Sequence, residues 1–151
     1  MAVNTKMHGA AGLACLLLTG CAASVDPKGR AHDVAAGYAE HVGVRPSLAR
    51  AVVHWESRGN MHAKAATSSA TGAMQVIDGT AAAIAGRHVT RAERKTVTGI
   101  KIGVAYLAAC QQAMPSAGDR QVWRSCYYYG HGAVGADIRV AQLAFQKLEA
   151  W

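Results

Sequence analysis

A single glutamate, Glu56, lies where an apolar helical run gives way to a loop of small and polar residues. The apolar run ends in Trp55, and the loop ends at residues 72–75, which read Gly-Ala-Met-Gln. A carboxylic acid donates a proton near neutral pH only if an apolar setting raises its pKa. Trp55, together with the loop folding over Glu56, would supply that setting by desolvation. The sequence therefore indicates a general acid, against the alternative of a solvated surface charge.

Four short elements, in order along the chain, carry a family resemblance. They are Glu-Ser-x-x-Asn at residues 56–60, Gly-Ala-Met-Gln at 72–75, Gly-Ile-x-x-Gly-x-x-Tyr-Leu at 99–107 and Cys-Tyr-Tyr-Tyr-Gly-His-Gly at 126–132. Together they resemble the lysozyme-like soluble lytic transglycosylases, which cleave the glycan strands of bacterial peptidoglycan. The resemblance covers about residues 34–135. It implies a mainly α fold with a single lysozyme-like helical domain.

The resemblance also implies a reaction. In this family one glutamate, here Glu56, acts as acid and then as base. It cleaves the β-1,4 bond between MurNAc and GlcNAc and leaves 1,6-anhydroMurNAc ends. Most glycosidases use two carboxylates, and the sequence offers no convincing second one. Asp78 is the nearest acidic residue after Glu56; we interpret it as a helix-start residue, with a catalytic part as the alternative.

The family's other site roles fall on residues that match its motifs. Ser57 would hydrogen-bond near the glutamate and the sugar acetamido group, and Asn60 would hold the loop after the helix. Gln75 and the backbone of Met74 would line the cleft, and Tyr127 would orient the acid. The chain departs from the family pattern at Gly99, which replaces an asparagine. It also departs at Ala73, which replaces a leucine, and at Tyr128, which replaces an asparagine; at these two positions substrate contacts would differ.

Two other functions stay open at this stage. One is a muramidase that hydrolyses the same bond with water. The other is a non-catalytic peptidoglycan-binding assembly factor of a secretion or pilus system. We expect no metal and no cofactor, because His54 and His62 lack the spacing of a zinc-binding helix and the other histidines are isolated.

The elements that would position these residues are helices, because apolar side chains recur at spacings of three and four. Pro46 would open the helix that delivers Glu56, and Gly59 with Asn60 would end it. The other expected helices cover residues 32–42, a short stretch to Ala85 capped by Asp78 or Thr80, a longer stretch capped by Thr98, residues 119–129 capped by Asp119, and residues 138–148.

The first 21 residues differ from the rest of the chain. Lys6 supplies positive charge, and an apolar run from Ala10 to Leu18 is too short to span a bilayer. This pattern predicts an export signal. Residues 18–21, Leu-Thr-Gly-Cys, look like a bacterial lipobox in which Cys21 becomes lipid-modified, the alternative being an ordinary cysteine near a simple cleavage site.

These features give an expected domain organisation and location. Residues 1–20 would be a signal peptide, residues 21–30 a lipid-anchored linker, and residues 31–151 the transglycosylase domain. The absence of aspartate after Cys21 favours the periplasmic face of the outer membrane, with a soluble periplasmic protein as the alternative. The lipid anchor would tether the domain to that membrane.

Cysteine usage and charge agree with export. Cys110 and Cys126 form an even pair that flanks a turn-rich stretch, so we predict a disulfide, with two separate buried thiols as the alternative. The formal charge of +7 favours an anionic partner. The basic residues are scattered rather than clustered, which argues against nucleic acid and favours the anionic stem peptides of peptidoglycan.

Overall fold

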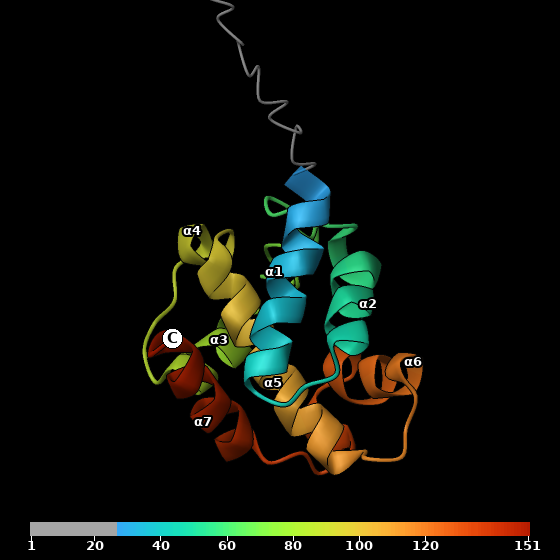
Figure 1. The fold of residues 1–151 in the computed structure, drawn as a ribbon. Helices are drawn as coiled ribbons and strands as arrows, with labels where there is room; N and C mark the ends of the chain where they lie inside the picture. Colours follow the sequence, from blue (N-terminus) through green and yellow to red (C-terminus); the bar gives the residue numbers. More distant parts are fainter. Residues whose placement is uncertain (1–26) are drawn as a thin grey trace, which may run out of the picture.

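Helices dominate the computed structural model, which describes residues 27–151 (Figure 1). At its centre lies α5 (Val97–Ala113), which packs against helices on several sides. Ten of its 17 residues are buried, so α5 is apolar nearly all round, as a core helix must be. Its neighbours are α1 (Pro27–His41), α3 (Asp78–Ala85), α4 (Arg91–Arg94) and α7 (Ile138–Glu149). The predicted mainly α fold class is confirmed.

The helix α1 packs beside α2 (Pro46–Ser57) (Figure 1). The buried face of α1 consists of alanines, among them Ala31, Ala35 and Ala39. Their spacing of four residues places them on one side of the helix, and their small side chains let the two helices approach closely. The helix begins at Pro27, within the segment of residues 21–30 that the sequence predicts as a linker. Proline suits this position because its missing N–H has no partner in a first turn and its φ is already helical.

The end of α2 differs from the prediction in a way that concerns the site. Arg58, rather than Gly59 or Asn60, is the first residue to take the left-handed conformation, with φ of 55°, and its N–H donates to the carbonyl of His54. Gly59 follows with φ of 83°. A left-handed residue other than glycine costs about 1 kcal/mol. The chain therefore turns sharply two residues after Glu56.

Two other predicted caps are displaced by one or two residues. Thr96, not Thr98, begins α5, and its hydroxyl accepts a hydrogen bond from the N–H of Thr98. Gly118, not Asp119, precedes α6 (Asp119–Val122). The carboxylate of Asp119 is instead engaged by Arg45, whose Nε donates to it over 2.8 Å. A long-range ion pair has taken the side chain that a local cap would use.

A disulfide joins the end of α5 to the segment that follows α6. Cys110 and Cys126 are bonded, with their Cα atoms 5.6 Å apart, which confirms the predicted bridge. Cys126 belongs to η1 (Trp123–Tyr128), a widened π-helical turn that continues α6 and precedes the short turn η2 (His131–Ala133). Such turns are frequent at functional sites. Among the helices of residues 27–151, none is long and apolar enough to cross a membrane.

Candidate active site

Glu56 lies in the last turn of α2, partly buried beside η1. The indole Nε1–H of Trp123 donates a hydrogen bond to its Oε1 over 2.6 Å. Burial raises the pKa of the Glu56 carboxyl group, and the bond from Trp123 opposes this rise but is the smaller effect. The ring of Trp55 packs against the ring of Trp123, with their centroids 5.0 Å apart. Burial thus has the effect on the Glu56 carboxyl group that the sequence led us to expect.

Tyr127 belongs to η1, like Trp123, and lies close to Glu56. It is hydrogen-bonded to the loop between α2 and α3. Its hydroxyl donates to the carbonyl of Met74 over 2.8 Å. Burial raises the pKa of this hydroxyl well above 10, and the charges of Glu56 and Tyr106 add to that effect. The proton of Tyr127 is thus directed to the loop rather than to the glutamate. The role of orienting the acid stays a prediction.

Gly103 on α5 leaves room for the loop at Met74 and for η1 at Tyr127 to meet. A Cβ built there would lie 2.5 Å from Sδ of Met74 and 2.9 Å from the hydroxyl oxygen of Tyr127, both closer than real contacts allow. Met74 itself is only 1% exposed. The glycine of the third sequence element therefore leaves the space in which the second and fourth elements touch.

The Glu-Ser-x-x-Asn element holds the loop from the other side. The hydroxyl of Ser57 donates to the carbonyl of Ala73 over 2.7 Å, and Oδ1 of Asn60 accepts from the N–H of His62 over 2.9 Å. Gln75 has a left-handed backbone, with φ of 49°, and its side-chain Nε2 donates to the carbonyl of Gly72. Asn60 thus accepts a hydrogen bond from within the loop after the helix, and the roles predicted for Ser57, Asn60 and Gln75 stay predictions.

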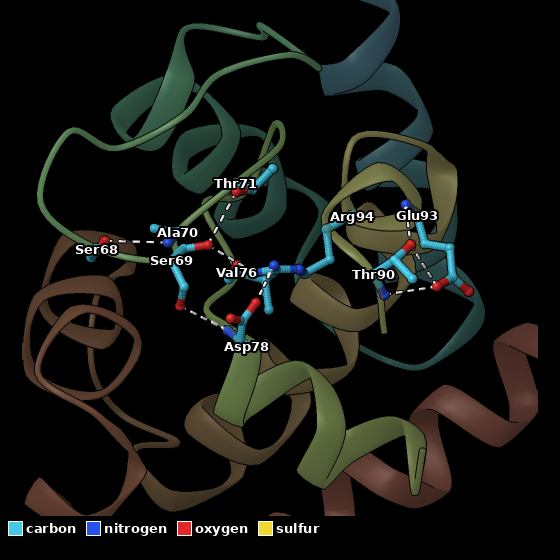
Figure 2. Close-up of polar contacts among 9 residues, drawn as sticks. All are labelled: Ser68, Ser69, Ala70, Thr71, Val76, Asp78, Thr90, Glu93 and Arg94. Atoms are coloured by element: carbon cyan, nitrogen blue, oxygen red, sulfur yellow. Dashed lines mark hydrogen bonds and ion pairs between the residues drawn. The ribbon is translucent and has the colours of Figure 1, made fainter. Parts of the chain in front are cut away.

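Arg94, which the sequence did not single out, fastens the same loop to the core. Figure 2 shows its guanidinium reaching the backbone carbonyls of Ser69 and Val76, each 2.8 Å from Nη1, and it also pairs with the carboxylate of Asp78. The side chain is 1% exposed. Asp78 begins α3 after Ile77, without acting as a cap. Its carboxylate is therefore committed to a structural ion pair rather than to the candidate site.

The short helix that carries Arg94 is itself well fixed. Thr90 and Glu93 form a reciprocal capping box, drawn in Figure 2, in which each side chain bonds the other residue's backbone N–H. The carbonyl of Arg94 is approached so closely that a Cβ at Gly72 or at Gly99 would lie 2.0 Å from its oxygen. Position 99, where the chain departs from the family's asparagine, thus permits contact between α4 and α5.

These elements enclose a cavity of about 420 Å³ that Glu56 lines. Within the part of the chain that the structure describes, Glu56 is the only aspartate, glutamate, histidine, lysine or arginine that lines it. Its walls come from the loop, from α3, from α5 and from η1: Ala65, Ser68, Ala70, Gln75, Val76, Ile77, Thr80, Tyr106, Tyr127, Tyr128, Tyr129 and Gly130. Among residues 27–151, the cavity therefore has a single carboxylic acid and a wall of tyrosines.

Two tyrosines on this wall are open to solvent. Tyr128 and Tyr129 are each 64% exposed, and their rings meet edge to face with centroids 5.2 Å apart. Both rings therefore belong to the cavity wall and not to the core. No three histidine, cysteine or carboxylate side chains among residues 27–151 gather closely enough to hold a metal ion.

The sequence reasoning missed Trp123 and Arg94 for different reasons. Trp123 precedes Tyr127 by four residues, a spacing that places both on one side of a helical segment, so this signal was available. Arg94 belongs to a short charged stretch, Arg91–Arg94, that looks solvent-exposed. Nothing local indicates that one of its arginines is buried.

Comparison with known proteins agrees with this geometry. A family model described as the transglycosylase SLT domain matches residues 33–147, which is most of the chain. No curated protein and no solved structure gave a match. The family match includes Glu56, the loop, Gly103 and Tyr127, the residues that the fold brings together around the cavity. The chain belongs to the SLT transglycosylase family, whose members are lytic transglycosylases acting on peptidoglycan.

Proposed function

We propose that this protein cleaves the β-1,4 bond between MurNAc and GlcNAc in peptidoglycan and leaves 1,6-anhydroMurNAc ends, with Glu56 as acid and then base. The observation that carries the proposal is that Glu56, partly buried, is the single carboxylic acid that the described residues 27–151 place in the cavity. Its raised pKa keeps more of it protonated near neutral pH than an ordinary glutamate. A single carboxylate favours a route in which the substrate supplies the nucleophile.

In the proposed reaction, Glu56 first transfers its proton to the glycosidic oxygen while the bond from that oxygen to C1 of MurNAc breaks. The acetamido group of the same sugar stabilises the positive charge that develops at C1. The Glu56 carboxylate then removes the proton from the 6-hydroxyl group, whose oxygen bonds to C1. No water is consumed, and Glu56 ends the cycle protonated.

The remaining residues support this proposal as positioning groups. Ser57 ties the end of α2 to the loop, and Tyr127 ties η1 to the same loop at Met74. Both bonds end on adjacent carbonyls, those of Ala73 and Met74, so the loop is held against Glu56 from two directions. This arrangement favours a fixed distance between the acid and a glycan strand lying in the cavity.

Mass spectrometry of soluble muropeptides released from purified sacculi tests the reaction. Glu56→Gln is the matched control, because the amide keeps an oxygen for the Trp123 bond but has no acidic proton. We expect the native protein, and not the variant, to release products one water lighter than the hydrolysed sugars. Reducing-end products would instead mean a muramidase. Absence of release by two folded, sacculus-binding proteins would mean a wall-binding assembly factor.

We also propose that the protein is exported and anchored at the outer membrane through lipid on Cys21. The segment concerned lies outside the described residues, and the support is its sequence, with a short apolar run ending in Leu-Thr-Gly-Cys. The bond between Cys110 and Cys126 is consistent with an oxidising compartment. Metabolic labelling with a fatty-acid analogue should mark the native protein and not Cys21→Ser. A soluble, unlabelled native protein would contradict the anchor.

A further inference from the structure

The two carboxylate oxygens of Glu56 have different surroundings. Oε1 accepts the indole N–H of Trp123 over 2.6 Å. Oε2 has no hydrogen-bond partner among residues 27–151, and Glu56 lines the cavity. An indole nitrogen can donate a hydrogen bond but cannot accept one. A proton placed on Oε1 would compete with the indole hydrogen, so the acid proton belongs on Oε2.

We propose that Trp123 is a positioning residue that keeps Oε1 of Glu56 as an acceptor and so confines the acid proton to Oε2, the oxygen free to reach a glycosidic bond. The inference rests on the proposed function of Glu56. Trp123 does not line the cavity, so it would act on the reaction only through the glutamate.

Both partners of this bond are held firmly. The Trp123 ring contacts those of Trp55 and Tyr128, with centroid distances of 5.0 and 5.8 Å. The turn that carries it is tied to α5 by the disulfide at Cys126. The guanidinium of Arg120 covers the Trp55 ring at 5.8 Å. These contacts restrict the indole, so we expect its N–H to keep one direction whatever the protonation state of Glu56.

The other ionisable groups near Glu56 differ from it in pKa or make contacts with other residues. Burial raises the pKa of Tyr127 and Tyr106 above 10, so both stay neutral while Glu56 titrates. Arg120 on α6 lies over the ring of Trp55. His131 on η2 contacts the hydroxyl of Tyr106. His131→Gln therefore identifies any part of a pH profile that comes from this histidine.

The test compares Trp123→Phe with Trp55→Phe. Both variants keep an aromatic ring in the contact between the two tryptophans, but only the first removes a hydrogen bond to Glu56. Carboxyl-carbon NMR titration reports the pKa of Glu56 without requiring turnover. We expect this pKa to rise further in Trp123→Phe, since the lost donor stabilised the carboxylate, and to stay at its native value in Trp55→Phe.

Turnover supplies the second readout. We expect kcat of Trp123→Phe to fall by about tenfold, the loss of roughly one hydrogen bond in the transition state, while KM stays near the native value. The alkaline limb of its pH profile should move upward with the pKa. An unchanged pKa, or a shifted pKa with unchanged kcat, would overturn the inference. If the native protein releases no glycan product while the pKa shift is present, the proposed function fails instead.

A measurement on the unmodified protein covers the case in which Trp123→Phe does not fold. The chain has three tryptophans, so its indole N–H resonances are few. We expect the Trp123 resonance to titrate with the same midpoint as the Glu56 carboxyl carbon, and those of Trp55 and Trp151 to lack this transition. A Trp123 resonance that does not follow Glu56 would contradict the bond on which the inference depends.

Discussion

Replacing Arg94 by methionine should destabilise the protein through the loop that forms the cavity wall. Methionine has a similar length and fills the space, but it removes the donors to the carbonyls of Ser69 and Val76. The loop between α2 and α3 has little other regular structure, with isolated bridges joining Lys64 to Thr71 and Thr71 to Val76. Arg94 thus attaches this loop to α4 through two side-chain hydrogen bonds.

The magnitude follows from the two carbonyl bonds. A hydrogen bond to a charged donor contributes about 1.5–3 kcal/mol, and two that share one guanidinium do not add fully. Leaving a buried carbonyl oxygen without its donor costs about 1–3 kcal/mol. We therefore expect Arg94→Met to lower the free energy of unfolding by about 3–4 kcal/mol. At about 3–4 °C per kcal/mol in a domain of this size, Tm should fall by about 10–15 °C.

Thermal unfolding followed by circular dichroism measures this change, with Asp78→Asn as the matched control. That substitution breaks the ion pair but keeps both carbonyl bonds. Because the Asp78 side chain is 60% exposed, its loss should cost about 1 kcal/mol or less. If Arg94→Met unfolds within about 1 kcal/mol of the native protein, or no earlier than Asp78→Asn, the carbonyl bonds do not hold the loop and the reasoning is refuted.

Three further outcomes follow from the same geometry. Gly103→Ala should lower both Tm and activity, because overpacking against Met74 costs about 2 kcal/mol and exceeds the gain of about 1 kcal/mol from alanine in a helix. Gly37→Ala should raise Tm, because no atom lies within 4 Å of the added Cβ. Replacing both disulfide cysteines by alanine should cost about 3 kcal/mol in chemical denaturation, and a free-thiol count on the unreduced native protein should give none from this pair. Glu56→Gln should raise Tm at neutral pH but not near pH 4. Because the pKa of Glu56 is raised in the folded state, the native carboxyl group stabilises the fold below its unfolded pKa of 4.5, and this stability is lost as pH rises through the folded pKa. Equal Tm differences at both pH values would contradict that assignment.

Local patterns in the sequence were sufficient for most of the helices. The spacing of apolar residues predicted α2 with Glu56 at its end and α7 with its start at Ile138. Such predictions succeed because helix periodicity and termination depend on neighbouring residues. The cysteine pair was also predictable, since its members flank a short turn between two helical segments.

The caps were less predictable because long-range partners compete for the same side chains. Asp78 and Asp119 were both expected to cap helices. Each is the first residue of its helix, but its carboxylate is paired with a distant arginine, Arg94 or Arg45. A carboxylate that gains a charged partner across the fold no longer needs the first-turn N–H groups. Sequence spacing contains no information about which of these two uses prevails.

By itself, then, the sequence determined the family, the helical class and the identity of Glu56 as the candidate acid. Only the tertiary structure decided what surrounds that acid: the N–H of Trp123 on one of its oxygens, Gly103 as the space for Met74, and Arg94 buried under the loop. The physical reason is that hydrogen bonding and burial depend on which surfaces pack together in the fold. These tertiary contacts join residues that lie tens of positions apart in the chain.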